Sequence, residues 1–80
     1  MVDHCQLRAG RALTGLSQAD VAAAAGLSIP TLKRAEADGK IKVSEDAILA
    51  IVSALQKAGV EFIPENGGGA GVRMKKRVKR

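Results

Sequence analysis

Aromatic residues are nearly absent from this 80-residue chain, which has one phenylalanine, Phe62, and neither tryptophan nor tyrosine. Hydrophobic residues nevertheless make up 46% of the sequence, and alanine is the most frequent among them. Alanine is a strong helix former with little side chain to bury. The composition therefore favours short, closely packed helices over a sandwich or a barrel, and the length fits one domain.

Cysteine and histidine each occur only once, as Cys5 and His4. A single cysteine cannot form a disulfide within the chain, which fits a reducing cytoplasm. One cysteine and one histidine are also too few for a zinc site within one chain. No base accompanies Cys5 at a spacing that suits nucleophilic catalysis, and we expect Cys5 to be a small buried residue.

Patterns that bind cofactors are also missing. The glycine-rich stretch at residues 67–71 has some likeness to a phosphate-binding loop, but no Lys-Ser or Lys-Thr pair follows it. It also lacks the strand-to-helix context of such a loop. We therefore expect no enzyme activity, no cofactor and no metal.

Long apolar runs are absent as well. The strongest one, from Ala47 to Leu55, is interrupted by Ser53 and is too short to cross a bilayer. The first residues lack the basic and then apolar pattern of a signal peptide. The sequence thus predicts a cytoplasmic protein with no membrane partner.

Positive charge is concentrated at the C-terminal end. The net charge is +5, yet residues 1–72 contain seven basic and eight acidic residues, so the body is nearly neutral. A polybasic tail can bind phosphates non-specifically by releasing counterions, or it can serve as a solvated, solubilising end. We expect residues 75–80 to form a disordered basic tail.

Capping residues and apolar spacing predict four helices, at residues 3–14, 17–26, 28–37 and 44–58. The expected N-terminal caps are Asp3, Ser17, Ser28 and Ser44. Asp20 follows Ser17 by three residues, as in a capping box. Leu7 and Leu13 of the first helix are expected to be buried, and Leu32 and Ala35 of the third to face inward. Val21, Ala24 and Ala25 follow at helical spacing in the second helix, and Ile48, Ile51, Val52 and Leu55 form the strongest apolar stripe, in the fourth.

The segment after Gly59 changes character. Residues 60–63 form a short β-prone run, turn residues follow from Pro64 to Gly69, and residues 72–74 can return as a second strand. A hairpin over residues 60–74 is favoured, packed on the last helix or on a second copy of the chain, because an isolated hairpin is unstable. The alternative is a flexible tail from Glu65 onward.

The spacing within residues 17–36 suits a helix-turn-helix. Ala22 or Ala23 offers the small residue that two crossing helices need, and Gly26 allows the tight turn. Ser28 can start the next helix at once, and Pro30 suits its first turn. The segment therefore meets each geometric requirement in order.

The sequence closely resembles the Xre/Cro-type helix-turn-helix family of bacterial and phage regulators. The matching residues are Ser17-Gln18, Val21-Ala22, Ala25-Gly26-Leu27-Ser28, Thr31-Leu32, Ala35-Glu36 and Asp38-Gly39. The resemblance implies an all-α, four- to five-helix, lambda-repressor-like domain at residues 1–59. It also implies that residues 60–74 are a C-terminal extension, either a hairpin or a dimerisation arm.

The family resemblance implies a sequence-specific DNA-binding transcriptional regulator, a repressor, with a recognition helix at residues 28–37 in the major groove. Double-stranded DNA is the expected partner, and a homodimer is left open. The residues expected at the DNA are Ser17, Gln18, Ser28, Ile29, Pro30, Thr31, Lys33 and Arg34. Non-specific phosphate contacts are expected from Lys40, Lys42, Arg73, Lys75, Lys76 and Arg77. Gln18 contacts a phosphate or braces the recognition helix, and Glu36 pairs with Arg8 or Arg11.

Two residues depart from the pattern of the family, since Ile29 and Pro30 stand where hydrogen-bonding side chains are usual. This departure and the nearly neutral body leave room for a rival hypothesis, an antiactivator or adaptor that binds another transcription factor, beside the leading one of DNA binding. Ile29, Pro30 and the 60–63 surface are then the contact sites, because exposed apolar patches mark interfaces. An antitoxin-like partner of a toxin is a third, weaker alternative.

Overall fold

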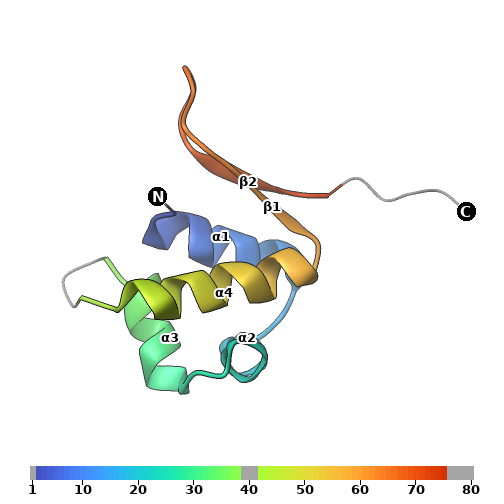
Figure 1. Cartoon of the computed structure of the whole chain (residues 1–80). Helices are drawn as coiled ribbons and strands as arrows, with labels where there is room; N and C mark the ends of the chain where they lie inside the picture. Colours follow the sequence, from blue (N-terminus) through green and yellow to red (C-terminus); the bar gives the residue numbers. More distant parts are fainter. Residues whose placement is uncertain (1, 39–41, 76–80) are drawn as a thin grey trace, which may run out of the picture.

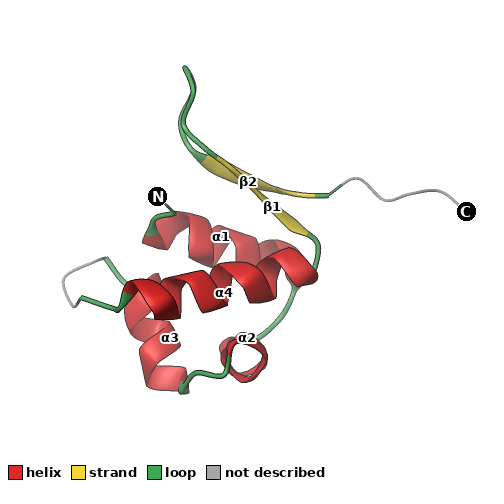
Figure 2. Ribbon diagram, viewed as in Figure 1, coloured by secondary structure: helices red, strands yellow, loops and turns green. Residues whose placement is uncertain are grey.

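The computed structural model describes residues 2–38 and 42–75. Within these residues the chain forms four helices, followed by one antiparallel hairpin (Figures 1 and 2). The elements are α1 (His4–Thr14), α2 (Gln18–Ala25), α3 (Ile29–Glu36), α4 (Glu45–Lys57), β1 (Val60–Ile63) and β2 (Gly71–Met74). The predicted helical domain with a short C-terminal hairpin is confirmed, and the alternative of a flexible tail from Glu65 is wrong as far as Lys75.

The four predicted N-terminal caps are all present, and each polar side chain accepts a hydrogen bond from a backbone N–H of the first helical turn. In α2 the capping box is complete. The Ser17 hydroxyl accepts from the Asp20 N–H at 3.0 Å, and the Asp20 carboxylate accepts from the Ser17 N–H at 3.1 Å. Such caps satisfy N–H groups that have no partner within the helix. They therefore fix where each helix begins.

The core lies between the helices and the hairpin. Its fully buried members come from every helix and from β1: Leu7, Val21, Ala22, Leu32, Ile51, Leu55 and Val60. Gly10 of α1 permits this packing, because a Cβ atom there would lie 3.3 Å from Leu55 Cδ1 and 3.4 Å from Val60 Cγ1. A glycine at this position thus lets α4 and β1 approach α1 closely.

Two expectations for α1 are wrong. Cys5 is exposed, because it stands about 200° around the helix from the buried Leu7. Leu13 is 46% exposed, because it lies in the last turn, beyond the neighbours that cover Leu7 and Gly10. Ala24 of α2, which stands at helical spacing from the buried Val21, is exposed.

The hairpin packs across α1 and α4, on the side of α1 that faces away from α2 and α3 (Figure 2). In the antiparallel register Phe62 pairs with Val72 and Val60 pairs with Met74. The amide of Gln6 in α1 donates to the Gly71 carbonyl at 3.1 Å. Val60 is 1% exposed, so the expectation that residues 60–63 form an exposed apolar contact surface is wrong at Val60, where that side chain fills the core.

An exposed ion pair joins the two strands, with Arg73 Nε donating to Glu61 Oε1 at 3.1 Å. The hydrogen bonds from Arg73, and then its charge, lower the pKa of Glu61. Because this pKa is lowered, the ion pair stabilises the folded chain at pH values above the ordinary carboxyl pKa. This contribution is lost as the pH falls through the lowered value.

Replacing Arg73 with alanine is expected to raise the pKa of Glu61 back toward its ordinary value, because both the hydrogen bonds and the charge are removed. A carbon-detected NMR titration of the Glu61 carboxyl measures this shift. Lys57→Ala removes a positive charge at the end of α4 and serves as the control. An unchanged Glu61 titration in Arg73→Ala would contradict the pairing.

Candidate nucleic-acid interface

The turn between α2 and α3 is short and well defined. Gly26 adopts the left-handed conformation, with φ 71°, and its N–H bonds the Ala23 carbonyl at 3.2 Å. The next N–H, from Leu27, bonds the Ala22 carbonyl at 2.9 Å. This pattern ends a helix while satisfying its last carbonyls. Ser28 then caps α3 immediately, so the two helices are set at a fixed angle.

The helix α3 has one buried side and one exposed side. Leu32, Ala35 and Glu36 are buried, as the sequence predicts for the first two. Ile29, Pro30, Lys33 and Arg34 are all exposed. Neither the Lys33 side chain nor the Arg34 side chain forms a hydrogen bond or an ion pair with any described residue. These four of the predicted DNA-facing side chains therefore lie on the accessible part of α3, and its two positive charges have no partner among the described residues.

Three hydroxyl groups lie at the starts of α2 and α3. Ser28 Oγ accepts from the Thr31 N–H at 3.2 Å and shares a second hydrogen bond with the Thr31 hydroxyl, at 2.9 Å. One hydrogen bond between two hydroxyls uses only one of their protons. The other proton of this pair, and the hydroxyl proton of the exposed Ser17, remain able to bind an acceptor such as a phosphate oxygen.

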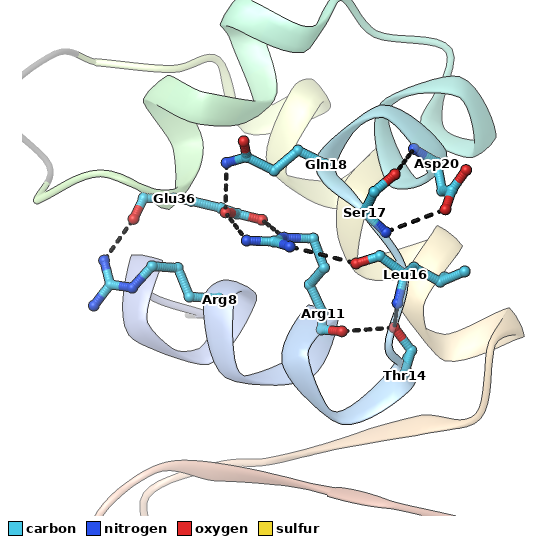
Figure 3. Close-up of polar contacts among 8 residues, drawn as sticks. All are labelled: Arg8, Arg11, Thr14, Leu16, Ser17, Gln18, Asp20 and Glu36. Carbon is cyan, nitrogen blue, oxygen red and sulfur yellow. Dashed lines mark hydrogen bonds and ion pairs between the residues drawn. The ribbon is translucent and has the colours of Figure 1, made fainter.

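A buried carboxylate joins the first three helices (Figure 3). Glu36 is 4% exposed and accepts from Arg11 Nε at 2.7 Å on one oxygen. Its other oxygen accepts from Arg11 Nη2 and from Gln18 Nε2, each at 3.1 Å. The guanidinium is thus bound by both carboxylate oxygens, the geometry of the stronger charge-assisted pairs. The prediction that Glu36 pairs with Arg8 or Arg11 is confirmed for Arg11.

Further bonds extend this cluster, which we call the Glu36 cluster and which comprises Arg8, Arg11, Gln18 and Glu36. Arg8 donates to the backbone carbonyl of Glu36, and Arg11 donates to the carbonyl of Leu16 at 3.3 Å. The hydrogen bonds to Glu36, and its negative charge, raise the pKa of Arg11 above its ordinary value. The cluster therefore connects the buried C-terminal end of α3 to α1 and α2.

The structure gives Gln18 one of its two predicted roles. Its amide nitrogen donates to Glu36, so the side chain braces the C-terminal end of α3. A phosphate contact by Gln18 stays a prediction.

The other basic residues are spread over the molecule. Lys42 is exposed just before α4. Arg73 and Lys75 lie on and after β2, across α1 and α4 from α3, and Arg73 is paired with Glu61. Lys40, Lys76 and Arg77 lie outside the described residues. The positive charges of α3 and those of the hairpin therefore occupy different sides.

Sequence reasoning missed some of the residues that hold the site. Leu16 accepts a hydrogen bond from Arg11 through its backbone carbonyl, and Arg8, which was named as a possible partner of Glu36, donates to the Glu36 backbone carbonyl. No spacing rule reveals such bonds to the backbone. Gln6, which caps α1 together with Asp3 and reaches Gly71, did leave a signal. Asp3 and Gln6 stand three residues apart, which is the spacing of a capping box.

The described part of the chain contains no group of three or more His, Cys, Asp or Glu residues that suits a metal ion. Among the same residues, no helix has the length and apolar character needed to cross a membrane.

The tight turn, the steeply set α3 and its exposed basic face define a helix-turn-helix protein. A family model described as a helix-turn-helix domain matches residues 5–62. The chain belongs to this helix-turn-helix domain family, and in general terms it is a DNA-binding regulator. A comparison with curated proteins found no match.

Proposed function

We propose that this protein is a sequence-specific transcriptional regulator of the Xre/Cro type that represses by occupying its operator. The observation that carries the proposal is the exposed face of α3, where Lys33 and Arg34 have no partner among the described residues. Unpaired basic side chains cost little to bring against phosphates and base edges. The Glu36 cluster keeps that face in a fixed orientation, which base reading requires.

Within this proposal the exposed residues have distinct roles. Arg34 reads a guanine through its two-pronged guanidinium, the commonest specific contact in the major groove. Lys33 binds a phosphate. The hydroxyls of Ser17, Ser28 and Thr31 bind phosphates or base edges at the helix starts, where backbone N–H groups also favour anions.

We further propose a homodimer on a two-fold operator, with half-sites about one helical turn apart. Residues 1–59 form the DNA-binding domain, and residues 60–74 form an extension that is free to serve as a dimerisation arm. The extension lies away from α2 and α3, so a second copy could pair there without covering the recognition helix. Repression follows simply, because a dimer on a promoter excludes the polymerase.

A second candidate is an antiactivator or adaptor that binds another transcription factor. The exposed apolar side chains of Ile29, 41% exposed, and Leu49, 58% exposed, favour it. These two residues lie on different helices, α3 and α4, and an interface of stable size needs about 800 Å² on each partner. The observation therefore supports this candidate less than the basic face supports DNA binding.

A fluorescence titration of the full chain against the DNA upstream of its own gene tests the proposal. We expect binding at physiological salt that exceeds binding to a scrambled duplex by about a thousandfold or more. Sedimentation of the protein–DNA complex gives its stoichiometry. If the upstream DNA binds no better than the scrambled duplex, DNA reading fails, and capture of a purified transcription factor would then support the second candidate.

Removing residues 76–80 is expected to reduce the salt dependence of DNA binding without changing the preferred sequence. Each of the four basic residues in this segment that contacts a phosphate contributes about 0.9 to the slope of log K against log salt. Titrations at several salt concentrations measure the slope. An unchanged slope would show that the segment makes no phosphate contact.

A further inference from the structure

The first two residues of α3 offer no side-chain group that can hydrogen-bond to a base. Ile29 and Pro30 have apolar side chains, and both are exposed. Pro30 has no N–H, and the N–H of Thr31 is already bonded to Ser28 Oγ at 3.2 Å. A helix start usually offers several free N–H donors, but here Pro30 offers none and that of Thr31 is taken, and the exposed side chains of Ile29 and Pro30 add an apolar surface.

This surface is continuous with the proposed DNA contacts. Lys33 and Arg34 stand one turn further along the same side of α3, because residues three and four positions apart share a helix face. In helix-turn-helix proteins the N-terminal residues of the recognition helix contact the base edges. If α3 enters the major groove, Ile29 and Pro30 therefore lie nearest to the bases.

The major groove contains one apolar group, the 5-methyl of thymine. An apolar side chain placed against a guanine, an adenine or a cytosine amino group would remove its water and give no bond in return, which costs free energy. Against a thymine methyl the same side chain buries apolar surface, which is favourable. The pair Ile29 and Pro30 is thus suited to thymine both by attraction and by the penalty on other bases.

We propose that Ile29 and Pro30 read thymine methyl groups, so that each half-site contains thymine opposite the first turn of α3. This inference rests on the proposed DNA-binding function and specifies the chemistry of the site that is read. A protein partner would use the same apolar side chains differently, since thymine methyls would then play no part.

Replacing thymine by deoxyuridine in the bound duplex, one position at a time, tests the inference, because only the methyl group is removed. We expect about fourfold weaker binding at one or two positions per half-site, which corresponds to burial of one methyl group. Ile29→Ala should weaken binding to the thymine duplex and should make the affected position insensitive to deoxyuridine. Leu49→Ala, which truncates an exposed apolar residue of α4, is the matched control and should keep the full effect.

The outcomes separate this inference from the function on which it rests. Specific binding that is unchanged by deoxyuridine at every position overturns the thymine reading and leaves the DNA-binding function intact. A methyl effect that persists in both Ile29→Ala and Pro30→Ala also overturns it, because other residues would then contact the methyl. Absence of specific binding to any upstream duplex defeats the proposed function as well. Circular dichroism melting of each variant confirms that it is folded.

Discussion

Replacement of Glu36 by alanine is expected to lower the free energy of unfolding by about 3 kcal/mol. The substitution removes the carboxylate that accepts three side-chain hydrogen bonds, two from Arg11 and one from Gln18. Arg11 is only 25% exposed, so its guanidinium would be left partly buried without a counter-charge. For a domain of this size each kcal/mol corresponds to about 4–8 °C in melting temperature, so thermal melting measures the effect easily.

The hairpin supplies the matched control. Glu61→Ala also breaks a carboxylate–arginine pair, but Glu61 and Arg73 are both well exposed. Exposed pairs contribute little because water and salt screen them, and we expect a small change in stability. Equal losses of unfolding free energy in Glu36→Ala and Glu61→Ala would contradict the view that the Glu36 cluster stabilises the fold because it is buried.

The Glu36→Ala variant also bears on function. Because the Glu36 cluster holds α3 against α1 and α2, Glu36→Ala should weaken DNA binding even at a temperature where it is fully folded. Glu36→Gln keeps the shape and an acceptor oxygen while it removes the charge. Glu36→Gln should therefore lose less stability and less DNA affinity than Glu36→Ala.

Replacement of Arg34 by alanine is expected to weaken specific DNA binding by about 1–3 kcal/mol and to relax the preference at one base pair. The reason is that the guanidinium of Arg34 is exposed, has no partner within the described residues and lies on the outer side of α3. A bidentate contact with a guanine accounts for an effect of this size. Fluorescence titration against duplexes that vary one base pair at a time measures both the loss and the relaxed preference.

Lys33→Ala is the comparison for Arg34→Ala, because Lys33 is its neighbour on the same exposed side. A phosphate contact carries no sequence information. Lys33→Ala should therefore weaken binding to all duplexes to a similar degree and reduce the slope of log K against log salt by about 1. Both variants should melt close to the parent protein, since neither side chain contacts the core. If Arg34→Ala weakened every duplex uniformly, Arg34 would be a phosphate contact and not a base reader.

Local signals in the sequence were sufficient for the helices. Ser17, Ser28 and Ser44 cap the helices that they were predicted to cap, and Gly26 ends α2 in the left-handed conformation. Caps and turns involve residues close together in the chain, so short-range rules describe them well. The hairpin was harder to predict. The same residues would form a flexible tail if no surface were present for the two strands to pack on, and local signals do not reveal such a surface.

Side-chain burial was predicted less well where it depended on distant neighbours. Leu13 continues the apolar stripe of α1, yet the last turn of the helix is left uncovered. Cys5 was expected to be buried from its residue type, although its position on the helix turns it to solvent. Leucine and cysteine are commonly buried residues, but only the packing of other elements decides whether a particular one is covered.

The sequence alone determined the length and order of the helices, the tight turn at Gly26 and the apolar character of Ile29 and Pro30. The tertiary structure decided which polar groups meet. It brought Glu36 to Arg11 and Gln18, residues separated by 25 and 18 positions in the chain, and it put the hairpin on the side away from α3. The physical reason is that capping and periodicity are local properties of the backbone. The partners of a buried charge are instead fixed by how whole helices pack.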